Sequence, residues 1–150
     1  MSSSFDDGLA MFPVSITLPV QWGDQDAFGH VNNTIFLRWF ESARIAYCRR
    51  VGLSAPREGI GVGPIMAAIS CNYRRQVTFP DTVRIGSRIA RIGRTSLVME
   101  HAVIGEASGA VVADGSSTLV VFNYGVQKPT PVPDEVRRAI EALEGGSRGG

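Results

Sequence analysis

The sequence predicts an α+β domain in which an antiparallel sheet of about five strands curls around one long helix. A strand pattern is followed by a single long apolar helix pattern and then by four strand patterns in succession. The later strands are separated only by PD, by Arg94 and by ASG. Such short separators fit antiparallel neighbours, because a parallel crossover needs about a dozen residues or more. Since one helix cannot cover both faces of this sheet, the sheet is expected to curl around it and to need further cover from a terminal helix or a second subunit.

Length and composition fit one globular domain. A chain of 150 residues with 44% hydrophobic and 19% charged residues supports a single core. The formal net charge of +1 does not indicate a large nucleic-acid-binding surface. No apolar run approaches the ~18–20 residues that cross a bilayer, and the start MSSSFDDGLAMF has no signal-peptide pattern. We therefore expect a cytoplasmic protein with no nucleic-acid or membrane partner.

The first strand is predicted over residues 14–20. The preceding residues 1–12 are polar or irregular and are expected to be flexible. Apolar and polar side chains then alternate from residue 14 to residue 20, which is typical of a half-buried strand. Pro19 cannot donate a backbone hydrogen bond, which predicts that this strand lies at an edge or bends there.

The long helix is predicted from Thr34 to about Val51. Aromatic and small apolar residues form one broad face of this stretch, and charged residues form a narrow one. At ~1.5 Å per residue the helix is about 27 Å long, close to the width of a small domain. It must therefore be largely enclosed. Gly52 is the expected C-terminal stop.

The rest of the chain predicts a meander and a final helix. Residues 53–64 form a Gly- and Pro-rich loop. Four stretches rich in β-branched or alternating residues then predict strands: 65–79, 82–93, 95–106 and 110–123. PDEVRRAIEALEGG predicts an amphipathic helix, and residues 145–150 are expected to be a flexible tail. With no linker, residues 1–150 form one domain.

The few cysteines and histidines argue against a metal site. Cys48 and Cys71 are expected to be small buried hydrophobes. His30 and His101 are far apart in sequence and lie outside any HExxH pattern, so no metal is expected. His101 falls in a strand pattern and is predicted to be packed or at the surface. Two cysteines also argue against a disulfide framework.

Residues 20–34, VQWGDQDAFGHVNNT, hold the candidate chemistry. Gly23 and Gly29 let the chain turn sharply before the long helix. The first turn of that helix has free N–H groups and a partial positive charge, which can hold a developing oxyanion. Asp24 and Asp26 place carboxylates a few residues upstream, opposite such a carbonyl. The same residue types are also ordinary helix caps and Asx-turn residues, so a purely structural explanation is the alternative.

The stretch WGDQDAFGHVNNTIFLRWFESAR resembles the signature of acyl-CoA thioesterases of the hotdog fold, in particular the 4-hydroxybenzoyl-CoA thioesterase-like family. In that family a D-x-D-x-x-G-H-V-N-N type loop leads into the central helix. The likeness continues through YRRQVTFPDTVRIGSRIARIGRTSLVMEHAVI and covers about residues 14–124. The resemblance implies the hotdog fold, a sheet wrapped around a long helix. It also implies a homodimer joined edge to edge, or a homotetramer.

The resemblance further implies a hydrolase that cleaves acyl-CoA to a carboxylic acid and free CoA, without a cofactor. By position in the motif, Asp26 matches the catalytic carboxylate, and the backbone N–H near Asn33 matches the group that polarises the thioester carbonyl. Asp24 would be structural. Asp26 could attack directly or activate water, and both routes require it to be ionised. Further substrate contacts are expected in the same loop: Gly29, His30, Val31, Asn32 and Thr34.

Cationic side chains are expected at the mouth of the substrate channel, because coenzyme A carries phosphates. The candidates are Arg74, Arg75, Arg88, Arg91 and Arg94, of which we predict Arg91 and Arg94. Glu41, two turns into the helix, is the alternative carboxylate, although an ion pair with Arg38 or Arg44 accounts for it as well.

Two other functions share the predicted fold. Hotdog dehydratases use an aspartate and histidine pair for proton transfer, but their loop does not resemble this one. A non-enzymatic acyl-thioester binder is the second alternative, since a fold does not define a function. The sequence determines neither the acyl group nor whether its carrier is CoA or a protein.

Overall fold

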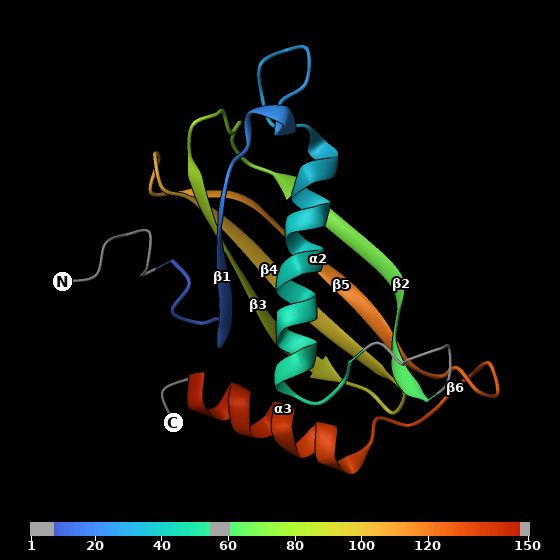
Figure 1. Ribbon diagram of the computed structural model, residues 1–150. Coiled ribbons are helices and arrows are strands. Elements are labelled where there is room, and N and C mark those ends of the chain that lie inside the picture. Colours follow the sequence, from blue (N-terminus) through green and yellow to red (C-terminus); the bar gives the residue numbers. More distant parts are fainter. Residues whose placement is uncertain (1–7, 55–60, 148–150) are drawn as a thin grey trace.

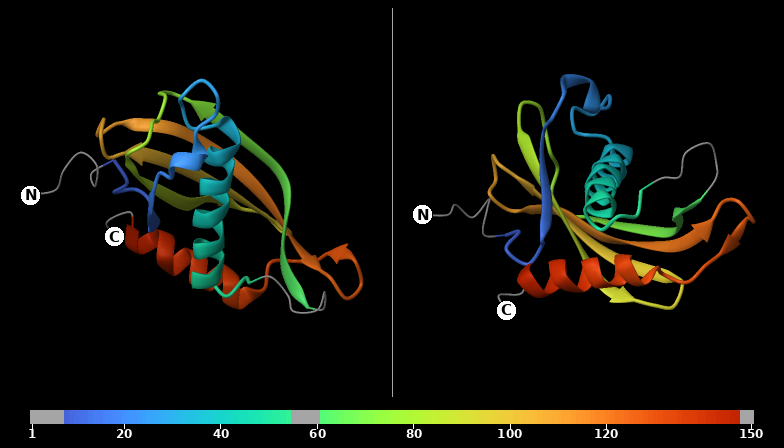
Figure 2. Two further views of the ribbon diagram at one scale, coloured as in Figure 1. Left: turned by 45° about the horizontal axis from the view of Figure 1, so that its top comes forward. Right: turned by 60° about the horizontal axis from the view of Figure 1, so that its bottom comes forward.

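The computed structural model describes residues 8–54 and 61–147 (Figure 1). One antiparallel sheet has the order β1-β3-β4-β5-β2, and β6 pairs with β5. The strands are β1 (Val14–Pro19), β2 (Val62–Tyr73), β3 (Thr82–Ile92), β4 (Ser96–Gly105), β5 (Val111–Asn123) and β6 (Lys128–Pro129). The sheet curls around the long helix α2 (Asn33–Arg50), as two further views show (Figure 2). The predicted α+β architecture is confirmed.

The two edges of the sheet are β1 and β2. Pro19 ends β1, which among the described strands pairs with β3 alone, so its predicted edge position is confirmed. β2 differs from its predicted range of 65–79. It begins at Val62, because that residue already pairs with β5, and it ends at Tyr73, because the next two N–H groups both turn to the Val112 carbonyl. Residues 74–81 therefore form a loop that leads into β3.

α2 is the centre of the core. It packs mainly against β1 and β3. Its buried side chains are Phe36, Trp39, Phe40, Ala43, Arg44, Tyr47 and Cys48. The helix begins one residue before the predicted Thr34, because Asn32 is the cap and its Oδ1 accepts the Thr34 N–H at 3.0 Å. Gly52, with φ of 82°, follows the helix end as expected.

α3 (Asp134–Ser147) crosses the end of the sheet beside the C-terminal end of α2 (Figures 1 and 2). Ile140 joins the same core cluster as Tyr47. The buried Glu144 carboxylate accepts hydrogen bonds from the Tyr47 hydroxyl and, at 2.7 Å, from the Ile89 N–H. These bonds tie α3 to both α2 and β3.

Both ends of the chain are ordered further than the predicted tails. Residues 145–147 belong to α3, so only residues 148–150 of the predicted C-terminal tail lie outside the described residues. Near the N-terminus, Leu9 is buried against Ala102 and Ile104. Together with Phe12 it covers Gly86, on the face of the sheet away from α2. Part of the outer face is therefore covered by the chain itself.

A buried polar row crosses the sheet beneath α2. His101 on β4 is 1% exposed, and its ring nitrogens lie 2.7 Å from Ser87 Oγ and 2.8 Å from Ser117 Oγ. Its ring stacks on Phe40 at 4.8 Å, and Arg44 donates to Ser117 Oγ at 3.3 Å. Burial, with the nearby Arg44 charge, lowers the pKa of His101 to about 3. Of the two predicted positions for His101, packed or at the surface, the structure shows the packed one, and at pH 7 its ring is neutral.

We expect the folded state to lose stability as the pH falls from about 6.5 towards 3. Over this range the unfolded chain binds a proton at His101 that the folded chain does not, because the folded pKa is lowered to about 3. The stabilisation of the folded state that results from this lowered pKa is complete above pH ~6.5 and decreases as the pH falls. Urea unfolding of the wild type and His101→Gln, at pH ~7.5 and ~4.5, should show a stability difference that shrinks at the lower pH. A difference independent of pH would contradict a lowered pKa.

Gly115→Ala should destabilise the fold by about 1–3 kcal/mol. A Cβ at Gly115 would lie 2.0 Å from the Ser70 carbonyl oxygen and 2.9 Å from the Phe40 ring, so β2 and β5 would have to separate. Gly145→Ala in α3 is the control, since a Cβ there meets no atom within 4 Å. Thermal unfolding should give a lower Tm for the first variant and an equal or higher Tm for the second. Equal Tm values would show that the strands tolerate the added methyl group.

Candidate active site

The loop between β1 and α2 begins with a short helical turn, η1 (Trp22–Asp24). The Asp24 carboxylate accepts the Gln21 N–H at 2.8 Å, and the Asp24 carbonyl accepts the Asn32 N–H at 2.9 Å. Gln25 Oε1 accepts the Phe79 N–H at 2.9 Å, which ties the loop to the segment before β3. The Asp24 side chain is therefore used within the turn.

Asp26 sits at the base of a tighter turn. Its N–H donates to the His30 carbonyl at 2.9 Å, and its carbonyl accepts the Gly29 N–H at 3.0 Å. Gly29 has φ of 83°, a conformation that favours glycine. One carboxylate oxygen, Oδ1, accepts the Phe28 N–H at 2.9 Å. Within the described residues, the other oxygen of Asp26 has no protein donor.

Within residues 8–54 and 61–147, one backbone N–H at the start of α2 has no acceptor. The neighbouring N–H groups donate over 2.8–3.0 Å: Val31 to the Val77 carbonyl, Asn32 to the Asp24 carbonyl, Thr34 to the Asn32 side chain and Ile35 to the Asn32 carbonyl. Among the residues that the structure describes, the Asn33 N–H has no acceptor. It lies at the positive end of an 18-residue helix.

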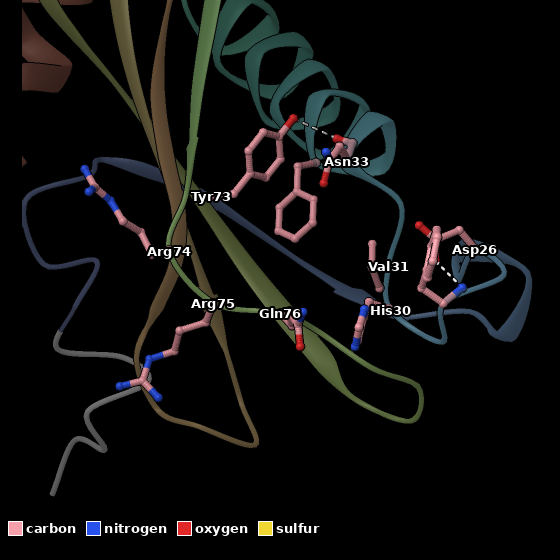
Figure 3. A pocket seen from close by; sticks show the side chains of 10 residues that line it. Asp26, His30, Val31, Asn33, Tyr73, Arg74, Arg75 and Gln76 are labelled. Atoms are coloured by element: carbon pink, nitrogen blue, oxygen red, sulfur yellow. Dashed lines mark hydrogen bonds between the residues drawn. The ribbon is translucent and has the colours of Figure 1, made fainter.

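A cavity of about 440 Å³ lies between this loop, the start of α2 and the end of β2 (Figure 3). It is lined by Asp26, Phe28, His30, Val31, Asn33, Phe36, Tyr73, Arg74, Arg75 and Gln76. The structure thus brings together at one concave site Asp26 and Asn33, whose second carboxylate oxygen and N–H have no partner among the described residues. Phe28, Phe36 and Tyr73 add aromatic surface to its wall.

Three of the loop residues predicted to contact substrate are not among those that line this cavity. The side chains of Asn32 and Thr34 form a hydrogen bond with each other at the helix cap, in which Thr34 Oγ1 donates to Asn32 Oδ1 at 3.0 Å. Gly29 provides the turn conformation. Glu41, the alternative carboxylate, also lies away from the cavity, and its side chain is 61% exposed with Arg44 at 4.0 Å.

Arg91 and Arg94 lie at the other end of the sheet. The site adjoins the start of β3, because the last residue of β1 pairs with Thr82, whereas Arg91 is near the end of β3. Arg91 lines a separate cavity beside α3, and the Arg94 carbonyl accepts the Val132 N–H at 2.9 Å. Within this chain, neither arginine reaches the cavity that contains Asp26.

Arg74 and Arg75, directly after β2, are the cations that the structure brings to the cavity. Arg74 is held by Asp114 through two contacts of 3.1 Å, and this hydrogen bonding lowers the pKa of the Asp114 carboxyl. Arg75 forms no ion pair within the described residues. Tyr73, the last residue of β2, and Gln76, in the loop after it, were not predicted as site residues, because the strand predicted from the sequence extends to residue 79.

The described residues contain neither a metal-binding cluster nor a membrane-spanning helix. No group of three or more His, Cys, Asp or Glu side chains that could hold a metal ion occurs within residues 8–54 and 61–147. In the same residues, no helix is both long enough and apolar enough to cross a membrane.

Comparisons with known proteins agree on one family. Residues 20–140 match the family model of the thioesterase-like superfamily. A thioesterase from Thermus thermophilus, solved with coenzyme A and Zn, is 37% identical over 90% of this chain and 96% of that chain, with a TM-score of 0.78. The putative thioesterase PA2801 from Pseudomonas aeruginosa is 34% identical over 86% and 98%, with a TM-score of 0.77. Long-chain acyl-CoA thioesterase FadM from Escherichia coli is 26% identical over 79% of this chain and 89% of its own length.

Proposed function

The chain belongs to the thioesterase-like superfamily. We propose that it is a hotdog-fold acyl-CoA thioesterase in which Asp26 and the Asn33 N–H carry out the hydrolysis. The reaction gives a carboxylic acid and free coenzyme A. One observation carries the residue assignment: Asp26 and Asn33 line the same cavity, and in the described part of the chain one has a carboxylate oxygen without a protein donor and the other an N–H without a protein acceptor. Asp26 provides the base or nucleophile, and Asn33 provides the oxyanion donor.

The proposed reaction begins with the thioester carbonyl oxygen on the Asn33 N–H. As a nucleophile attacks the carbonyl carbon, negative charge develops on that oxygen, and one backbone donor stabilises it by about 3 kcal/mol. The positive end of α2 adds to this stabilisation. In the direct route, Asp26 forms an anhydride, the C–S bond breaks and water then hydrolyses the anhydride. In the general-base route, Asp26 takes a proton from the attacking water and the thiolate leaves.

The proposed substrate contacts are those loop residues that face the cavity. The backbone turn brings the half-buried His30 next to Asp26, and Val31 contributes an apolar wall. Arg75 is proposed to attract the phosphates of coenzyme A, in place of Arg91 and Arg94. Arg75 lines the cavity and forms no ion pair within the described residues, whereas Arg74 is paired with Asp114.

We also propose a homodimer joined through the β2 edges, or a homotetramer built from such dimers. β2 is a 12-residue edge strand whose outer backbone groups are unpaired within the described part of the single chain. Ile65, Met66 and Ile69 on it are 41%, 38% and 38% exposed. A long apolar edge of this kind favours pairing with another strand. The cytoplasmic location expected from the sequence remains part of the proposal.

Asp26→Asn should lower kcat for thiol release by at least about 100-fold, because the variant has neither a base nor a nucleophile. The assay measures free thiol from short, long and aromatic acyl-CoA substrates, with CoA binding and Tm measured in parallel. Asp24→Asn is the matched control. It should lose about 1 kcal/mol of stability or less and keep most of its turnover, since its carboxylate serves the turn.

The opposite pattern, with turnover lost in well-folded Asp24→Asn and kept in Asp26→Asn, would show that the other acid is catalytic. Retention of full kcat by both variants would remove the carboxylates from the mechanism. Wild-type protein that binds every acyl-CoA and releases no thiol would instead be a binder.

Arg75→Ala should raise KM for acyl-CoA several-fold at low salt and leave kcat nearly unchanged. Attraction between an exposed guanidinium and a phosphate is screened by salt, so the KM difference should shrink at about 0.5 M salt. Arg91→Ala is the matched control and should leave KM unchanged. A KM increase confined to Arg91→Ala would show that the phosphates lie at the far end of the sheet, and would contradict the assignment of Arg75.

A further inference from the structure

Tyr73, the last residue of β2, connects the edge of the sheet to the first turn of α2. Its hydroxyl donates to the Asn33 carbonyl at 3.0 Å (Figure 3). Its ring packs edge-on against Phe36, with ring centroids 5.3 Å apart and an interplanar angle of 89°. The ring of Phe36 in turn packs against that of Trp39, with the ring centroids 4.9 Å apart. One aromatic row therefore extends from the sheet edge along the buried face of the helix.

The hydroxyl of Tyr73 links β2 to α2. Within the described residues it makes the one side-chain hydrogen bond that joins β2 to α2. The helix packs mainly against β1 and β3, on its other side. On the side of the cavity, the position of the helix start therefore depends on Tyr73 and its contact with Phe36.

The bonded carbonyl belongs to the residue whose N–H lacks an acceptor in the described structure. Tyr73 holds the C=O of Asn33, a residue that lines the cavity, and the N–H of the same residue is the proposed oxyanion donor. A donor contributes fully only when it points at the place where the oxyanion forms, and errors of about 1 Å in such positions can cost large factors in rate. Fixing the carbonyl end of Asn33 restricts the orientation of its N–H end.

We propose that Tyr73 is a positioning residue, whose hydroxyl orients the Asn33 N–H towards the thioester oxyanion. This inference rests on the proposed function of Asn33. Burial, with a smaller contribution from Cys71, raises the pKa of the Tyr73 phenol, so its hydroxyl keeps its proton and remains a donor. Since this proton is already given to the Asn33 carbonyl, Tyr73 acts through Asn33 and not on the substrate.

Tyr124 is a matched control elsewhere in the fold. Its hydroxyl also donates to a backbone carbonyl, that of Pro64, at 2.8 Å. Its ring also packs edge-on against a phenylalanine, Phe122, at 5.1 Å. This tyrosine follows β5 and contacts the start of β2, at the end of that strand opposite to Tyr73. Tyr73→Phe and Tyr124→Phe thus remove the same kind of bond, one beside the cavity and one away from it.

The first measurement is steady-state thiol release with the full chain. Tyr73→Phe should lower kcat about fivefold to tenfold and change KM less than about twofold, because the hydroxyl acts on the transition-state donor and not on substrate binding. Tyr124→Phe should keep both constants, with a Tm change similar to that of Tyr73→Phe. An equal loss of kcat in the two variants would overturn the proposal, since general destabilisation would then explain it.

The second measurement does not depend on activity. Hydrogen exchange of the backbone amides of residues 33–37 should be faster in Tyr73→Phe than in the wild type and unchanged in Tyr124→Phe. Faster exchange with full kcat would overturn the positioning role, and so would a lower kcat with unchanged exchange. If Asp26→Asn keeps full turnover, the proposed mechanism fails separately, and the exchange data still decide whether Tyr73 holds the helix start.

Discussion

The enclosure of α2 by the sheet is the constraint on which the rest of the structure depends. Phe36, Phe40 and Tyr47 bury one side of the helix from its first turn to its last. An enclosed helix cannot shift along its axis without opening cavities in the core. Its positive end is therefore held at one end of the sheet, where the loop from β1 and the end of β2 meet it. The site exists because the core leaves the helix only one position.

The hydrogen bonds of the loop show that helix capping and candidate chemistry are not alternatives. Asp24 and Asn32 use their side chains on the turn and on the cap, as ordinary loop residues do. By satisfying their neighbours, they leave the Asn33 N–H and one oxygen of Asp26 without partners in the described structure. A loop with fewer internal bonds would let these two groups turn to each other or to the loop itself, and would hold no defined substrate geometry.

Buried polar groups of the core, like the loop residues, form hydrogen bonds with their neighbours. His101 is neutral between two serine hydroxyls, and Glu144 accepts bonds from α2 and β3. Buried groups of this kind stabilise a fold only when they are paired, and they then allow few alternative packings. In the proposed mechanism the active groups are likewise attached to a rigid helix and a short turn, with Tyr73 as the proposed further restraint.

The sequence by itself determined the order of the elements, the antiparallel meander, the enclosed helix and the loop that carries Asp26 and Asn33. These features depend on local periodicity, on short connections and on a compact motif. Only the tertiary structure decided which distant residues join that loop. Because β1 pairs with β3 and β2 lies at the far edge, the end of β2 and the start of β3 both lie at the site, so Tyr73 and Arg75 reach it and Arg91 does not. Pairing between strands far apart in sequence follows from packing of the whole core, so local patterns in the sequence do not predict it.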